Sequence, residues 1–142
     1  MKASKLVIEY EFDFGLIAIA SAVKEFKLAW HLNQSLGLQL VKQQDEDLIF
    51  TKNRRILISN FLFETEYVSF RLLKNKAVES EGIPKPYLVA ELKQYDFLLK
   101  IEGENFELEI EKAFLNLKKI PVIQLVEKVS PNILQSKENL LF

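Results

Sequence analysis

Two carboxylates, Glu91 and Asp96, lie within the otherwise apolar run at residues 88–103, LVAELKQYDFLLKIEG. They are the best candidates for acid–base chemistry, which needs a carboxyl group whose pKa is shifted by burial or by a neighbouring charge. In a continuous strand their separation sends the two side chains to opposite faces, so they converge only if residues 92–94 form a turn or bulge. Together with Tyr95, they form the candidate functional set.

The same residues also have a purely structural interpretation. In it, Glu91 accepts backbone hydrogen bonds at a bend, and Asp96 caps a segment or lies in solvent. The catalytic interpretation instead requires the two carboxylates to converge to within about 9.5 Å. The sequence contains no G-x-x-x-x-G-K, G-x-G-x-x-G or G-x-S-x-G motif, and we expect no cofactor.

Other residues of interest favour structural roles. His31 is the only histidine, which excludes paired-histidine metal sites; its projected position predicts a solvated side chain. Trp30 projects onto the apolar side of the same helix, so we expect it in the core. The acidic residues 45–47 lack the spacing of a calcium loop and predict a solvated turn. The basic pairs at 54–55 and 118–119 predict solvated ends of elements.

The printed sequence ends on three consecutive apolar residues, Leu140, Leu141 and Phe142. Apolar side chains at such a place are expected to dock on a surface. They either pack on their own domain, completing the core or adding an edge strand, or they pack across a dimer interface. Both alternatives make these three residues candidates for interaction.

Composition limits the class of protein. The chain has 142 residues, 49% of them hydrophobic, and is expected to form one domain over 1–142 with no need of a metal or disulfide. It has no cysteine and a formal net charge of -1, so we expect no nucleic-acid partner. No run approaches the roughly 18 uncharged apolar residues of a membrane span, and we expect no membrane partner. A cytoplasmic location is the simplest expectation.

Two helices are expected from the apolar periodicity and from residues that start and stop helices. The first spans 22–36, with Ser21 as its N-cap, Gly37 as its left-handed terminator and an apolar arc that includes Phe26 and Trp30. The second spans 106–119, with Asn105 as its N-cap and acidic residues in its first turn.

Strands are expected wherever apolar and polar residues alternate, at 5–12, 48–51, 55–64, 67–74, 87–91, 95–101 and 122–129. Residues 13–20 remain open, with a preference for an extended conformation, and 75–86 is expected to form a long loop. The order of elements predicts an α+β fold, in which an antiparallel or mixed sheet of about five to seven strands is packed by the two helices.

Three stretches carry a family resemblance. Residues 89–97, VAELKQYDF, align with the signature of the small bacterial proteins called the IPExxxVDY family, with Glu91 and Asp96 at its Glu and Asp and Ala90 where the signature has proline. Residues 24–38, KEFKLAWHLNQSLGL, are similar to the family's helix of the form KDYKLAWxLNxxLGL, and SKENLLF at 136–142 is close to its SKENLIF ending. The resemblance implies a shared fold and a bacterial origin, and it transfers no catalytic residue.

Two functional hypotheses follow. The leading one is a non-enzymatic, cytoplasmic protein-interaction module, either a homodimer or a subunit that docks a protein partner, because catalytic motifs are missing and the sequence ends on an apolar tail. The alternative is a small-ligand binder or enzyme that uses Glu91 and Asp96 in an aromatic-lined cleft.

Overall fold

The computed structural model describes residues 13–51, 54–82 and 86–142. In that part of the chain two α-helices accompany a six-stranded antiparallel sheet, in the order β2-β5-β6-β8-β1-β9, and a three-stranded sheet, in the order β3-β4-β7. The predicted α+β fold is confirmed. The helices are α2 (Glu25–Leu36) and α3 (Phe106–Leu117), and the strands are β1 (Phe14–Ala20), β2 (Val41–Lys42), β3 (Glu46–Thr51), β4 (Arg54–Ile58), β5 (Asn60–Glu64), β6 (Val68–Lys74), β7 (Glu79–Glu81), β8 (Phe97–Gly103) and β9 (Leu125–Val129).

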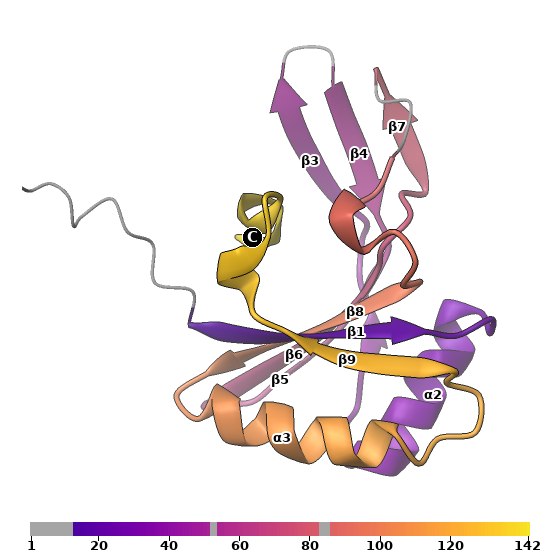
Figure 1. The fold of residues 1–142 in the computed structure, drawn as a ribbon, viewed down its shortest axis with the longest axis vertical. Helices are drawn as coiled ribbons and strands as arrows, with labels where there is room; N and C mark the ends of the chain where they lie inside the picture. Colours follow the sequence, from indigo (N-terminus) through magenta and orange to yellow (C-terminus); the bar gives the residue numbers. More distant parts are fainter. Residues whose placement is uncertain (1–12, 52–53, 83–85) are drawn as a thin grey trace, which may run out of the picture.

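Both faces of the six-stranded sheet are covered. Alternate side chains of β1, such as Ile17 and Ile19, pack with α2 and α3 in one core, whereas Leu16 and Ala18 belong to a second core on the opposite face. Figure 1 shows the helices below the sheet, with the three-stranded sheet and the 3₁₀ turns η1 (Ala90–Leu92), η2 (Pro131–Ile133) and η3 (Lys137–Leu140) above it. Because both faces are buried, β1 is apolar along its whole length.

The first helix differs from its prediction at its start and in the face it buries. It begins at Glu25, and Ser21 is not its cap: the Ser21 hydroxyl is buried and donates to the Val122 carbonyl at 2.6 Å. Its buried residues are Leu28, Ala29 and Leu32. The expectation that Phe26 and Trp30 lie in the core is wrong, since they are 64% and 57% exposed. The predicted terminator is confirmed, because Gly37 adopts the left-handed conformation at φ 68°.

Several strand predictions also need correction. The run at 55–64 is split at Ser59, so that β4 joins the three-stranded sheet and β5 the six-stranded one. The expected loop at 75–86 contains the short strand β7. The strand expected at 87–91 is absent from the described structure, which has one bridge at Tyr87 and then η1. The preference for an extended conformation at 13–20 is confirmed by β1, while the strand expected at 5–12 lies outside the described residues.

The second helix and the last strand are close to their predictions. Helix α3 ends at Leu117, two residues before the expected limit of 119, and Asn105 occupies the N-cap position without a side-chain capping hydrogen bond. The final strand is shorter than predicted, since β9 starts at Leu125. None of the helices in the described part of the chain has the length and apolarity that crossing a membrane requires.

Two glycines with positive φ provide a test of the packing. At Gly103 (φ 145°) an added Cβ would overlap the Tyr67 carbonyl oxygen, whereas at Gly37 (φ 68°) it would meet open space. We expect Gly37→Ala to cost about 1 kcal/mol of unfolding free energy from the backbone conformation alone, and Gly103→Ala to cost more, about 2–4 kcal/mol, because a backbone clash adds to the strain. Urea unfolding of both variants measures the difference, and equal losses would contradict it.

Candidate functional site

The structure gives the two candidate carboxylates separate partners. Glu91, on η1, accepts hydrogen bonds from the Ser136 backbone N–H at 2.8 Å and from its hydroxyl at 2.6 Å. Asp96, immediately before β8, accepts from the backbone N–H of Ser21 at 2.9 Å. Residues 92–94 do turn, but each carboxylate joins a different pair of segments. The structural interpretation therefore describes both: Asp96 caps the end of β1, and Glu91 binds backbone N–H groups.

Tyr95, the third member of the candidate set, is a buried structural residue. Its hydroxyl donates a hydrogen bond to the carboxylate of Glu127 on β9. That hydrogen bond is the main reason that the pKa of Tyr95 is raised, with burial and the negative charge of Glu127 adding to it. Tyr95 therefore keeps its proton at neutral pH and ties the 92–96 turn to the edge strand.

Residues 131–142, which we call the terminal segment, dock on their own domain. Leu140 is fully buried and Leu134 is 5% exposed, both in the core on the face of the sheet opposite the helices. Leu141 instead points outward, with 46% of its surface exposed. Of the two alternatives that the sequence left open, packing on the same domain is the one found for Leu140. The contact between Glu91 and Ser136 thus joins two regions that the sequence singled out separately.

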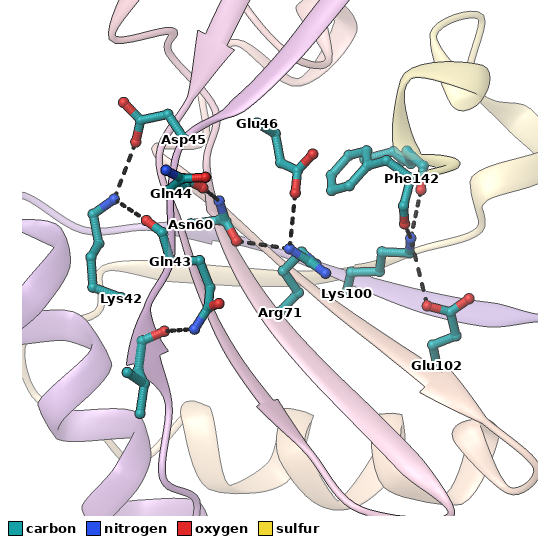
Figure 2. Close-up of polar contacts among 12 residues, drawn as sticks. Lys42, Gln43, Gln44, Asp45, Glu46, Asn60, Arg71, Lys100, Glu102 and Phe142 are labelled. Carbon is teal, nitrogen blue, oxygen red and sulfur yellow. Dashed lines mark hydrogen bonds and ion pairs between the residues drawn. The ribbon is translucent and has the colours of Figure 1, made fainter.

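Beneath Phe142 lie two cations, Arg71 on β6 and Lys100 on β8, which are directly opposite each other in the sheet register. Lys100 is 3% exposed, and its ammonium donates to the main-chain oxygens of Leu140 at 2.6 Å and Phe142 at 3.5 Å. The Phe142 ring lies 5.0 Å from the Lys100 nitrogen and 5.4 Å from the Arg71 guanidinium carbon. Figure 2 shows the two cations side by side, with Phe142 descending onto them from the terminal segment.

Like charges directly opposite each other in a sheet repel. Neighbouring groups offset this repulsion between Arg71 and Lys100. Arg71 lies 3.4 Å from the Glu46 carboxylate and donates to the Asn60 side-chain oxygen at 2.8 Å, and Lys100 lies 3.7 Å from Glu102. Burial lowers the pKa of Lys100, and the negative charge of Glu102 opposes part of that shift. The ring of Phe142 adds a cation–π contact to each positive charge.

This pair of cations was not found from the sequence, although a signal for it exists. Lys100 is the one charged residue in the run FLLKI of β8. In a strand that is buried on both faces, a lysine side chain is cut off from water. Acceptor groups on its own face of the sheet must then bind its ammonium group. Arg71 gave no such signal, because the first part of β6 alternates polar and apolar residues as any half-solvated strand does. Asn60 gave none because it is the first residue of β5, ahead of an apolar run.

The remaining candidates have structural partners. The ring of His31 makes an edge contact with Trp30, with centroids 5.0 Å apart. The acidic residues 45–47 are engaged by three different cations: Lys42 at 3.1 Å from Asp45, Arg71 near Glu46, and Arg55 in contact with Asp47. Among the described residues, no cluster of His, Cys, Asp and Glu is arranged to hold a metal ion.

The sequence matches no family model and no curated protein.

Acidification is expected to loosen the terminal segment through Glu91. Partial burial acts to raise the pKa of Glu91, but hydrogen bonds from the Ser136 hydroxyl and from backbone N–H groups together hold that pKa below its ordinary value. The stabilisation is therefore present above the unfolded-state pKa and is lost as pH falls through the lowered folded-state pKa. Hydrogen exchange at the Ser136 amide should become faster in this acidic range than intrinsic chemistry alone predicts.

Glu91→Gln should remove this acid dependence and speed exchange at Ser136 already at neutral pH, because the amide side chain carries no charge. Glu138→Gln, on the same segment, is the matched control and should keep the wild-type profile. An acid response that persists in Glu91→Gln would contradict the assignment.

Lys100→Met is expected to separate the stability of the domain from the docking of the segment. The substitution removes a buried charge at similar length and leaves its partner Glu102 half exposed to water, so the free energy of unfolding should stay within about 1 kcal/mol of wild type or rise. The oxygens of Leu140 and Phe142 lose their donor, so hydrogen exchange at residues 140–142 should accelerate. A large global loss in urea unfolding with an unchanged segment would contradict this assignment.

Proposed function

We propose that this protein is a non-enzymatic, cytoplasmic protein-interaction module that binds its partner through the outer face of α2. The observation that carries the proposal is the exposure of two large aromatic side chains, Phe26 at 64% and Trp30 at 57%. They are four residues apart and therefore adjacent on one side of the helix. The proposed partner is a second copy of the chain.

The chemistry of this face suits a protein interface. Tryptophan is enriched among the residues that contribute most to binding, typically at the centre of a contact and surrounded by polar groups. Here Lys24 and Lys27 flank Phe26 and are both exposed, which supplies such a polar rim. The buried residues of α2, Leu28, Ala29 and Leu32, hold the helix on the sheet, so the aromatic pair is presented on a rigid support.

The alternative, an enzyme or ligand binder that uses Glu91 and Asp96, has less support. Ser136 and Ser21 engage the two carboxylates separately. The groove between β1 and α3, of about 290 Å³, is lined by neither of them. On its wall Glu111 and Lys128 neutralise each other in an ion pair of 2.6 Å.

The resemblance to the IPExxxVDY family bears on the origin of the chain and not on its partner. The stretch at 24–38, which carries part of that resemblance, contains both Phe26 and Trp30. We propose family membership and a bacterial origin on this basis. The near-neutral charge favours a protein partner over a nucleic acid.

Self-association is expected to bury Trp30, the only tryptophan of the chain. Its fluorescence emission should therefore shift to shorter wavelength as protein concentration rises, with a midpoint that matches the dimer constant from sedimentation. Emission that stays characteristic of exposed tryptophan at every concentration, together with a monomer mass, would contradict the homodimer.

The variant Phe26→Ala/Trp30→Ala should weaken the dimer by about 30-fold or more, the loss expected when residues at the centre of an interface are truncated. Leu115→Ala is the matched control, because Leu115 is a similarly exposed apolar residue, at 59%, on α3. Urea unfolding should give near wild-type stability for both variants, since neither removes a buried side chain. Equal weakening by the control would show that the α2 face is not the binding surface.

A further inference from the structure

The terminal segment is bound to the domain in the way that a peptide is bound by a receptor. It lies outside both sheets, and its hydrogen bonds between backbone groups are local ones, such as Asn139 N–H to the Ser136 carbonyl at 2.9 Å. Groups from elsewhere in the chain hold it: the Glu91 carboxylate, the Leu88 carbonyl and the Lys100 ammonium.

These groups form three successive binding positions along the segment. Glu91 receives the N–H and hydroxyl of Ser136, and the Leu88 carbonyl accepts the side-chain amide of Asn139 at 2.9 Å. The third position is the cation pair, which binds the main-chain oxygen of Leu140 and the ring of Phe142. In order along the segment, the three positions bind a serine, an asparagine and an aromatic residue.

An apolar pocket completes the site. Leu140, between the second and third positions, is fully buried among residues of the second core that include Phe14, Leu92 and Leu98. Two of the exposed side chains of the segment are also apolar, Ile133 at 77% and Leu141 at 46%, and they lie among the exposed polar residues Asn132, Gln135 and Glu138. The segment therefore has an inner face that fits the domain and two exposed apolar side chains, Ile133 and Leu141, that nothing in the described structure covers.

We propose that this surface is a peptide-binding site whose ligand is the terminal segment of a second copy, so that two copies exchange residues 131–142. Exchange preserves every contact described above, because the same residues meet in trans. It also keeps Ile133, which is three residues after Ser130, close to the copy that supplies the segment, so that its exposed side chain lies beside a second domain. The segment leaves the domain at Ser130, directly after β9, the edge strand of the sheet.

The copy's own segment competes with the incoming one. A tethered segment acts at an effective concentration that reaches about millimolar, so a segment in trans binds measurably better once the tethered one is weakened. The variant Asn139→Ala/Phe142→Ala weakens the segment at two partly exposed residues and leaves the binding surface itself unchanged.

The test uses the full chain and a fluorescein-labelled peptide with the sequence of residues 131–142, PNILQSKENLLF. Fluorescence anisotropy should show the peptide binding at least about tenfold more tightly to Asn139→Ala/Phe142→Ala than to wild type, in line with removal of an internal competitor. Adding Lys100→Met to that variant should abolish the gain. A scrambled peptide is the control, and circular dichroism checks that each variant is folded.

Equal binding of the peptide to wild type and variant, binding that survives Lys100→Met, or binding of the scrambled peptide would each overturn the proposal. The result is separable from the fate of the α2 surface, which lies on the opposite face of the sheet. Phe26→Ala/Trp30→Ala should leave peptide binding unchanged. If the peptide does not bind but the protein still associates through Trp30, segment exchange alone is refuted. If the peptide binds but association does not depend on Trp30, the α2 interface alone is refuted.

Discussion

The structure depends on one constraint. The central strands β1 and β8 are buried on both faces of the sheet, but the helices cover only one of these two faces. An uncovered second face would expose Leu16, Ala18 and Leu98 to water, at a cost of roughly 25 cal/mol for each Å² of apolar surface. The chain covers that face with strands of the small sheet and with 3₁₀ turns, including η1 and the terminal segment (Figure 1). Turns bury apolar side chains only if their backbone polar groups also find partners. The functional candidates on this face arise from that requirement.

Asn75 shows how the requirement is met. It is fully buried, its side-chain amide donates to the carbonyls of Leu92 at 2.9 Å, Tyr95 at 3.2 Å and Val89 at 3.3 Å, and its oxygen accepts from the Val89 N–H at 2.9 Å. This one side chain thereby satisfies both backbone groups of Val89, in place of a partner strand, and holds the carbonyls of the following turn. The alternating pattern there predicted a strand because local sequence reports which residues are apolar. It cannot report that a distant amide will satisfy the backbone in a bent conformation.

The same distinction separates what could be predicted from what could not. Gly37, α3 and the strand β6 follow from local signals, namely a terminator, a periodic stripe and an alternation, and they were predicted within a few residues. The buried face of α2 was missed because the helix carries two apolar stripes, Leu28 with Leu32 and Phe26 with Trp30. The choice between them is made by the sheet and by α3. The Glu91 site was half predicted: its bonding to backbone N–H groups was expected, but its partner 45 residues away was not.

Lys100 and the terminal segment depend on each other in a way that relates packing to binding. Without the segment, the two adjacent cations would lose the main-chain oxygens and the Phe142 ring, and only Glu46 and Glu102 would balance their charge. Without the cations, the main-chain oxygens of Leu140 and Phe142 would be covered by apolar side chains with no donor. Burying a charge is favourable only when its hydrogen-bonding partners are held in place, so the site selects a segment with carbonyl groups and an aromatic ring at the right positions. The site makes the same contacts whichever copy supplies the segment. The groups that bury the segment on this face of the sheet are therefore also the groups that would recognise it in trans.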